Sequence, residues 1–260
     1  MVMCIKLKKA LIVFAKRPVP GRVKTRLSPP LSAGEAAELY RCMLEDVLAK
    51  TAHLPRIRKY LFYEGGVDAG IYFARTVRGM TCLPQQGNDL GERMANAFRH
   101  VFAEGCGAAA IIGTDSPDLP VSCIGKAYEL LKKAEAVLGP SEDGGYYLLG
   151  MREMHAGLFH DIPWSSANVL RESLRKAERA GITVSLLPPW HDVDTAEDLR
   201  RPQLLDEENG APLTRAFIKN WIGDRGSGIE SYPPNLEPRT SNLEPTSAPP
   251  HHTPARSDIR

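Results

Sequence analysis

Two aspartates follow a short apolar run in the stretch IIGTDSPDLP, residues 111–120. Asp115 and Asp118 would lie at the carboxyl end of a buried strand, where open α/β sheets bind their ligands. Carboxylate oxygens suit Mg²⁺ or Mn²⁺, and such ions also take phosphate oxygens as ligands. The stretch therefore predicts a metal site, although a turn or cap explains Asp118 at least as well.

A third carboxylate, Asp194, lies in HDVDTAEDLR, residues 191–200. Thr195 and Asp198 have nearly the spacing of a helix capping box, which leaves Asp194 without a structural role. A carboxylate that arrives from a distant strand would complete the metal site. We therefore predict that Asp194 joins Asp115.

The loop AKRPVPGRVKTRLSPPLS, residues 15–32, is rich in cations and follows the first apolar run. It has the glycine pattern of neither a Rossmann fingerprint nor a P-loop. Lys and Arg offset phosphate charge, so the loop predicts polyphosphate binding, with a solvated basic loop as the alternative. We expect the side chains of Lys24 and Arg26 to project from an exposed loop. The nucleotide-binding candidates in the loop are Lys16, Arg17, Gly21, Lys24, Thr25 and Arg26.

Further candidates lie in three later segments. In LPQQGNDLGERM, a helix expected near residue 90 would favour an anion at its amino end, with Asp89 as its N-cap; the nucleotide-binding candidates there are Gln86, Gly87 and Arg93. In SEDGGYYLLG and IPWSSANVL, the acceptor-binding candidates are Asp143, Gly144, Gly145, Tyr146 and Trp164, with Asp143 also a catalytic candidate. Backbone geometry is the alternative for the two glycines, and core packing for the tryptophan.

Strand-like and helical segments alternate through most of the chain. Apolar runs predict strands over residues 10–15, 59–64, 108–113, 136–140, 145–150 and 183–188. Three- and four-residue apolar spacing predicts helices over residues 33–51, 90–104, 124–134 and 168–181, and a final helix is expected within 209–223. This order predicts a mostly parallel sheet flanked by helices, with a hairpin or sheet extension at residues 139–150.

Composition narrows the class of protein. Hydrophobic residues make up 43% of the 260 residues and charged residues 25%, as in ordinary globular domains. The formal net charge of +2 argues against a nucleic-acid binder, and no segment reaches the length of a membrane span. Five scattered cysteines favour reduced thiols and a cytoplasmic location.

The segments KRPVPGRVKTRLSPPLS, QGNDLGERM, IGTDSPDLP, EDGGYYLLG, IPWSS and DVDTAEDL carry a resemblance across residues 8–222. Together they resemble a bacterial family of glycosyltransferases related to those of arsenosugar biosynthesis, within the nucleotide-diphospho-sugar transferase superfamily. KTRLSPPLS and DVDTAEDL are also similar to the guanylyltransferases of molybdenum-cofactor and deazaflavin-cofactor biosynthesis. The resemblance implies one GT-A-like domain over residues 1–223.

The resemblance also implies roles for individual residues. Asp115 matches the metal-binding aspartate after the central strand, and Asp194 matches a late aspartate that binds the same metal in some relatives. Lys24 and Arg26 match the phosphate-contacting loop. Gln86, Asp143 and Trp164 match nucleotide or acceptor sites more loosely, and TDSPD departs from a strict Asp-x-Asp at Asp118.

These residues lead to one main functional hypothesis and two alternatives. The main hypothesis is a glycosyltransferase that uses Mg²⁺ or Mn²⁺, a nucleotide-sugar donor and a small-molecule acceptor. The first alternative is a nucleotidyltransferase that releases pyrophosphate from a nucleoside triphosphate. The second is a non-catalytic nucleotide sensor.

Residues 224–260 are rich in Pro and Ser, and NLEP occurs twice within them. Such a segment buries too little apolar surface to offset its ordering entropy, which predicts a disordered tail. Truncation after Gly223 should leave the melting temperature and the response to nucleotide unchanged in a thermal-shift assay. A clear loss of either would contradict this prediction.

Overall fold

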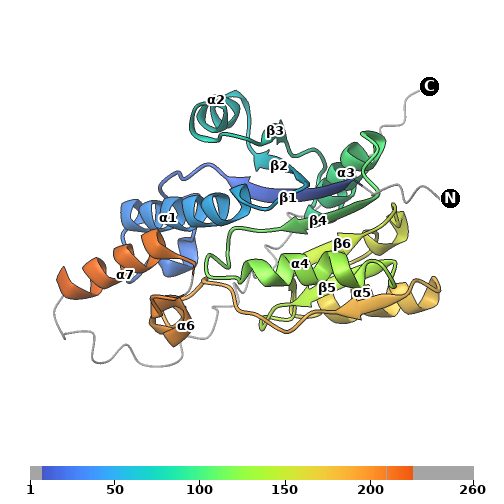
Figure 1. Ribbon diagram of the computed structural model, residues 1–260. Helices are drawn as coiled ribbons and strands as arrows, with labels where there is room; N and C mark the ends of the chain where they lie inside the picture. Colours follow the sequence, from blue (N-terminus) through green and yellow to red (C-terminus); the bar gives the residue numbers. More distant parts are fainter. Residues whose placement is uncertain (1–7, 209, 225–260) are drawn as a thin grey trace, which may run out of the picture. The chain divides into compact units, whose positions relative to one another are not determined.

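The computed structural model describes residues 8–208 and 210–224. They form a seven-stranded sheet in the order β3-β2-β1-β4-β6-β5-β7 (Figure 1). β6 runs antiparallel to β4 and β5, and the other neighbouring pairs of this sheet are parallel. The predicted α/β class is confirmed. The strands are β1 Lys9–Lys16, β2 Ile57–Glu64, β3 Thr81–Pro84, β4 Ala108–Ile112, β5 Ala136–Pro140, β6 Tyr146–Met151 and β7 Val184–Leu186.

Helices cover both faces of the sheet. They are α1 Ala33–Ala52, α2 Val67–Thr76, α3 Leu90–Ala103, α4 Val121–Leu130, α5 Val169–Arg179, α6 Pro202–Leu205 and α7 Pro212–Asp224, with short 3₁₀ turns η1 Thr25–Leu27, η2 Ala156–Leu158 and η3 Asp198–Arg200. Side chains alternate along β1: Ile12 and Phe14 pack in the cluster that contains α3, whereas Leu11 and Val13 pack with α4. The sheet therefore has an apolar layer on each side.

The direction of the strands decides where the loops meet. β1, β2, β3 and β4 are mutually parallel, so the segments that follow them leave from one edge of the sheet. β6 is antiparallel to β4, so it is the amino end of β6, at Tyr146, that lies at the same edge. This arrangement brings distant parts of the sequence to one place, as open α/β sheets do at their binding crevices.

Two of these elements, α2 and β3, were not predicted from the sequence. They lie together at the end of the sheet beyond β2 (Figure 1). The other strands and the long helices agree with the prediction to within a few residues at each end. The predicted tail lies outside the described residues from position 225 on.

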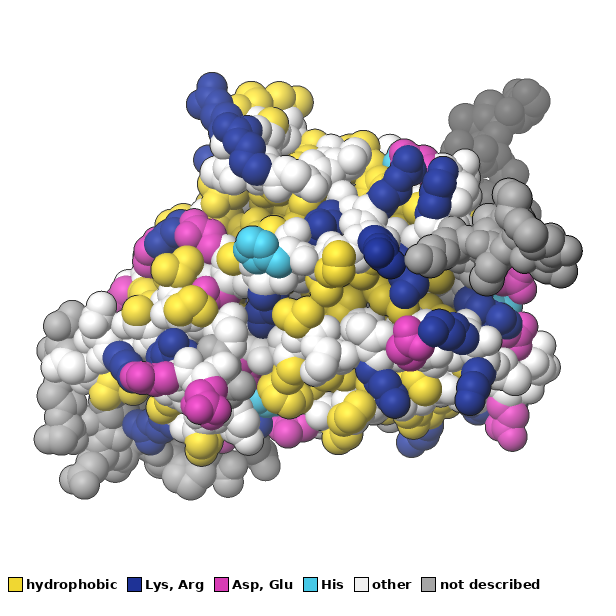
Figure 2. All heavy atoms as spheres, viewed as in Figure 1, with side chains coloured by type: hydrophobic (Ala, Val, Ile, Leu, Met, Phe, Trp, Pro, Cys, Tyr) yellow, Lys and Arg dark blue, Asp and Glu magenta, His cyan; other side chains and the backbone are white. Residues whose placement is uncertain are grey.

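Charged side chains are spread over the surface. Figure 2 shows Lys and Arg dispersed among acidic and apolar side chains on the described part of the viewed face, without one continuous basic tract. Among the helices of residues 8–208 and 210–224, none has the length and apolar character needed to cross a membrane.

The last helix is held by a buried carboxylate of α1. Asp46 is 2% exposed, and it accepts hydrogen bonds from the backbone N–H of Leu213 (3.1 Å) and of Thr214 (2.8 Å). It also accepts one from Thr214 Oγ1 at 2.7 Å. Asp46 therefore caps the amino end of α7, although it lies more than 160 residues earlier in the chain.

Replacement of this cap should destabilise the protein. Asp46→Ala leaves two backbone donors and one hydroxyl without their acceptor, so we expect the free energy of unfolding to fall by about 2–4 kcal/mol. Urea denaturation measures the change. Asp68→Ala, at an exposed carboxylate of α2, is the control and should change the free energy little. Equal stability of the two variants would contradict the capping role.

Candidate functional site

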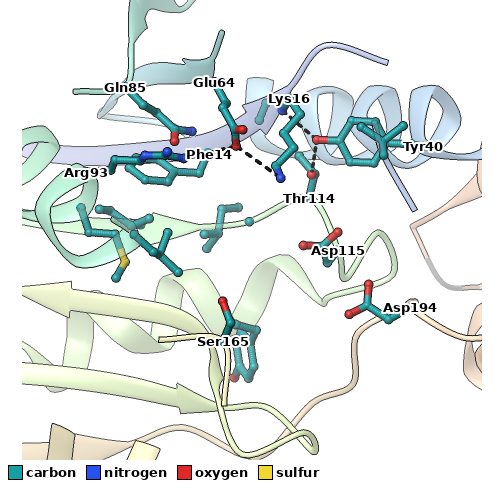
Figure 3. A pocket seen from close by; sticks show the side chains of 18 of the residues that line it. Phe14, Lys16, Tyr40, Glu64, Gln85, Arg93, Thr114, Asp115, Ser165 and Asp194 are labelled. Atoms are coloured by element: carbon teal, nitrogen blue, oxygen red, sulfur yellow. Dashed lines mark hydrogen bonds and ion pairs between the residues drawn. The ribbon is translucent and has the colours of Figure 1, made fainter. Parts of the chain in front are cut away.

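A cavity of about 640 Å³ opens at the carboxyl edge of the sheet (Figure 3). Its wall combines the end of β1, the cationic loop, α1, α3, the loop after β4 and the start of β6. The predicted site residues that line it are Lys16, Lys24, Thr25, Arg26, Arg93, Asp115, Tyr146 and Asp194. The sequence thus predicted much of this wall, but several of the predicted site residues lie outside the cavity.

The centre of the site is the contact of one ammonium with two carboxylates. Lys24 Nζ donates a short hydrogen bond to Asp115 Oδ1 and another, 2.9 Å long, to Asp194 Oδ1. The Lys24 side chain is 4% exposed, whereas that of Arg26 is 77% exposed and lies 4.0 Å from Asp194 Oδ2. The expectation that both cations project from an exposed loop is therefore wrong for Lys24, because the two carboxylates hold it inward.

Electrostatics keep this lysine charged. Burial alone would lower the pKa of Lys24, but Asp115 and Asp194 outweigh burial and raise that pKa above its ordinary value. Two carboxylates so close would otherwise repel each other. The ammonium compensates one of their two charges, which leaves a net charge of about −1 for the three groups.

Hydrogen bonds between two loops bring the carboxylates together. The backbone N–H of Val193 donates to the carbonyl of Asp115 at 2.8 Å. Asp192 accepts from Ser116 Oγ at 2.7 Å and from Ser141 Oγ at 2.5 Å. The segment after β4 is thereby tied to the segment that carries Asp194, which gives the predicted juxtaposition a structural cause.

Asp118 does not line the cavity, which corrects its prediction as a metal ligand. Its side chain is fully buried, with Oδ2 2.9 Å from His191 Nε2 and Oδ1 accepting from Trp190 Nε1 at 3.3 Å. A carboxylate enclosed in this way has no path to a ligand in the cavity. Asp118 instead anchors the loop after β4 to residues 190–191.

Tyr40 of α1 connects the ends of the two central strands and was not predicted. Its buried hydroxyl accepts a hydrogen bond from the backbone N–H of Lys16 (2.8 Å) and one from Thr114 Oγ1 (2.9 Å). Burial raises the pKa of Tyr40 to about 12, so the hydroxyl stays neutral. Within the helix pattern, Tyr40 is indistinguishable from a core aromatic.

The other end of the cavity carries a mixed polar group (Figure 3). Glu64 Oε2 lies 3.3 Å from both Lys16 Nζ and Arg93 Nη1. Gln85 Nε2 donates to the carbonyl of Phe62 at 3.0 Å. Arg93 was predicted, whereas Glu64 and Gln85 were not.

The prediction of Gln86 is wrong by one residue. Gln85 lines the cavity, whereas the side chain of Gln86 is outside it and its carbonyl accepts from Asn96 Nδ2 at 2.8 Å. Gly87 is also outside the cavity: its φ is +136°, and a Cβ there would lie 2.6 Å from that of Glu92. It lets the chain pass close to α3, whose predicted N-cap Asp89 accepts from the N–H of Glu92 at 2.8 Å.

The predicted acceptor side is represented in the cavity by Tyr146, with Ser165 as an unpredicted neighbour. Trp164 is outside the cavity, packed edge-on against Tyr146 with ring centroids 6.4 Å apart. Asp143 is exposed and accepts from the N–H of Gly145 at 2.9 Å within its own turn. Trp164 and Asp143 therefore shape the core and the hairpin rather than the cavity wall.

The remaining predicted candidates also lie outside the wall. Gly144 has a φ of +88°, and a Cβ there would collide with the carbonyl of Ala167, so close packing explains this glycine. Gly145 follows in the same turn, Gly21 is exposed, and Arg17 Nη1 lies 3.9 Å from Asp68 on α2.

Asp115 and Asp194 fit a divalent cation. Both direct an Oδ1 at one positively charged atom, Lys24 Nζ, which shows that their oxygens converge on a single cation position. Carboxylate oxygens are suitable ligands for Mg²⁺ or Mn²⁺. The metal prediction thus reduces to these two residues.

The contact with Lys24 determines how Asp115→Asn should change the free energy of unfolding. Without a compensating cation, Asp115→Asn would relieve repulsion and stabilise the protein. Because the buried Lys24 would lose a charged partner, we instead expect a loss of about 1 kcal/mol, reduced by the half-exposed position of Asp115. Chemical denaturation without metal measures it, with Asp143→Asn as the exposed control. An increase in stability would show that repulsion dominates.

The chain is similar in sequence to a bacterial domain family and to a guanylyltransferase. Residues 47–166 match a domain family described as an uncharacterized protein conserved in bacteria (DUF2064). The chain is 29% identical over 182 residues to 2-phospho-L-lactate guanylyltransferase of Methanothermobacter thermautotrophicus, covering 68% of this chain and 76% of that protein.

Solved structures share the fold. CMP:2-keto-3-deoxy-manno-octonic acid synthetase in complex with CTP has a TM-score of 0.51 at 11% identity, covering 76% of this chain and 98% of that one. A protein of Desulfovibrio desulfuricans G20, provisionally described as a nucleotide-diphospho-sugar transferase, has a TM-score of 0.73 at 33% identity. The match covers 83% of this chain and 98% of that protein. This chain therefore belongs to the same family of nucleotide-diphospho-sugar transferases and is a transferase.

Proposed function

We propose that this chain is a metal-dependent nucleotidyltransferase. It would transfer the nucleotidyl group of a nucleoside triphosphate to a small phosphorylated acceptor and release pyrophosphate. The observation that carries the proposal is the convergence of Asp115 and Asp194 on one cation position at the edge of a cavity rich in cations. The similarity to a guanylyltransferase supports it.

The charge of the cavity wall suits a triphosphate. Its cations near the two carboxylates come from the loop after β1, namely Arg22, Lys24 and Arg26, whereas Lys16 pairs with Glu64 at the other end. A nucleoside triphosphate carries several negative charges, which these side chains would offset, and arginine adds bidentate contacts. The phosphates would therefore lie over this loop.

The position of the phosphates determines the position of the nucleoside. With phosphates beside Asp115 and Asp194, the base would reach toward Glu64 and Gln85 at the other end of the cavity. A carboxylate can accept hydrogen bonds from the two adjacent N–H groups of guanine. GTP is therefore the first donor that we would test.

The reaction needs little acid–base chemistry from the protein. An oxygen of the acceptor's phosphate would attack the α-phosphorus of the triphosphate. The bond from this phosphorus to the oxygen that bridges the α- and β-phosphates would break, and pyrophosphate would leave. The attacking oxygen is already ionised, which agrees with the position of Asp143 outside the cavity wall. Lys24, Arg22 and Arg26 would stabilise charge on the phosphates. A Mg²⁺ or Mn²⁺ ion held by Asp115 and Asp194 would supply further neutralisation of phosphate charge.

Glycosyl transfer from a nucleotide sugar is the second candidate. It is favoured by the 33% identity to the Desulfovibrio protein. In this case the acceptor would attack the anomeric carbon of the sugar, and a nucleoside diphosphate would leave. The same cavity would bind the donor, so the released product separates the two reactions.

The test is a product assay over a panel of donors. We expect pyrophosphate from GTP with Mg²⁺ and a panel of small phosphorylated acceptors, and no nucleoside diphosphate from nucleotide sugars. Asp194→Asn should reduce pyrophosphate release by on the order of 100-fold, since it removes a ligand of the metal. Asp68→Asn, at an exposed carboxylate that does not line the cavity, should retain the full rate.

Two results would contradict the proposal. Release of nucleoside diphosphate from a nucleotide sugar would support glycosyl transfer. Nucleotide binding without turnover across both panels would support a sensor.

A further inference from the structure

We propose that Lys24 is an internal counterion for Asp115 and Asp194 that competes with the metal until a donor phosphate draws its ammonium away, so that metal and donor bind cooperatively. The inference rests on the proposed function, because it assigns a polyphosphate to the cavity. It concerns how the Lys24 ammonium, the metal and the donor phosphates exchange partners when they bind, and not the transfer reaction itself.

The position of Lys24 is unusual for a phosphate-binding lysine. It lies in a cationic loop, yet its side chain is almost completely buried and its ammonium contacts both carboxylates. Its backbone adopts φ 48° and ψ 40°, a left-handed conformation that costs energy for a residue with a Cβ. The surrounding contacts therefore direct this side chain toward Asp115 and Asp194 rather than toward solvent.

The ammonium lies where the carboxylate oxygens converge, and the same oxygens are the ones that fit a divalent metal. A metal ion and the ammonium repel each other, so both cannot share the two carboxylates at short range. In the protein alone, Lys24 would thus compete with the metal. Displacement of Lys24 must accompany metal binding.

A polyphosphate gives the displaced ammonium a new partner. Lysine is a flexible point charge on a four-carbon stem, and the exposed Arg22 and Arg26 beside it mark the place where phosphates would lie. The metal would neutralise both carboxylates, and the freed ammonium would pair with a phosphate oxygen. Metal and polyphosphate should therefore each raise the affinity of the site for the other by the same factor.

Arg26 provides the matched comparison. It belongs to the same loop and its Nη1 lies 4.0 Å from Asp194 Oδ2. Unlike Lys24, it is exposed, and the ion pairs of the described residues do not include one between Arg26 and Asp115. Loss of Arg26 should weaken phosphate binding without releasing the carboxylates. Lys24→Met and Arg26→Met thus separate the two functions of the loop.

The experiment is calorimetric titration of the full chain with Mn²⁺, first alone and then with saturating inorganic tripolyphosphate. We expect Lys24→Met to bind Mn²⁺ alone about tenfold tighter than the unsubstituted protein. Arg26→Met should bind it only slightly tighter, because Arg26 is exposed and reaches one of the two carboxylates. After correction for chelation of Mn²⁺ by free tripolyphosphate, measured in a titration without protein, tripolyphosphate should raise the Mn²⁺ affinity of the unsubstituted protein about tenfold and that of Lys24→Met much less. Lys24→Arg, which keeps the charge, should retain weak binding of Mn²⁺ alone.

Further variants identify where the ion binds. Asp194→Asn in the Lys24→Met background should abolish the gain in Mn²⁺ affinity. Glu153→Gln should not, although Glu153 lies in a separate Glu135–Glu153–His155 cluster. If Lys24→Met is too unstable for calorimetry, its melting temperature should rise more on addition of Mn²⁺ than that of the unsubstituted protein.

The inference is overturned if Lys24→Met binds Mn²⁺ alone no more tightly than the unsubstituted protein, or if the gain survives Asp194→Asn. Either result could coexist with pyrophosphate release from GTP, in which case the proposed function would stand without the counterion. Conversely, the expected Mn²⁺ pattern without any pyrophosphate release would support the counterion and refute the nucleotidyl transfer.

Discussion

A buried charge needs a compensating charge, and this requirement organises the edge of the sheet. Lys24 contributes an ammonium that is nearly inaccessible to water, and only the contact with Asp115 and Asp194 makes its burial tolerable. The two carboxylates in turn need the cation, because they face each other from loops that are almost eighty residues apart in sequence. Lys24, in the cationic loop after β1, is thus held by partners that lie 91 and 170 residues later in the chain.

Further hydrogen bonds hold these segments together. Tyr40 joins the ends of β1 and β4, while Ser116, Asp192 and Ser141 join the loop after β4 to the hairpin of β5 and β6. Asp118 and His191 add a fully buried contact below them. Asp115 is therefore fixed on both sides, as the proposed metal site requires if its geometry is to be formed before the metal binds.

The sequence predicted the parts of this architecture that depend on local pattern. Apolar runs and helical spacing located most elements, and the strand-end position of Asp115 indicated its place at the edge of the sheet. Prediction from the sequence failed where contacts between distant residues decide which side chain reaches the cavity or which segment forms an element. α2 and β3 were missed because β3 has only four residues and α2 contains a glycine and a β-branched start. Asp115 and Asp118 are both aspartates, three residues apart, so the sequence could not distinguish them. The contacts of Asp118 with Trp190 and His191, which enclose it, appear only in the structure. Gln85 and Gln86 are chemically identical, so the choice between them depended on the path of the chain after β3.

Helix α1 links the cavity to a distant part of the chain. Tyr40 and Asp46 are six residues apart on it; one meets the ends of the central strands and the other the amino end of α7. Both are buried polar groups whose partners would be exposed if the helix moved. Local opening of α7 would release Asp46 and remove a contact from the helix that carries Tyr40, so we expect the stability of α7 and that of the cavity wall to be coupled. Amide hydrogen exchange in α7 therefore tests the stability of the helix that carries Tyr40, although no residue of α7 lines the cavity.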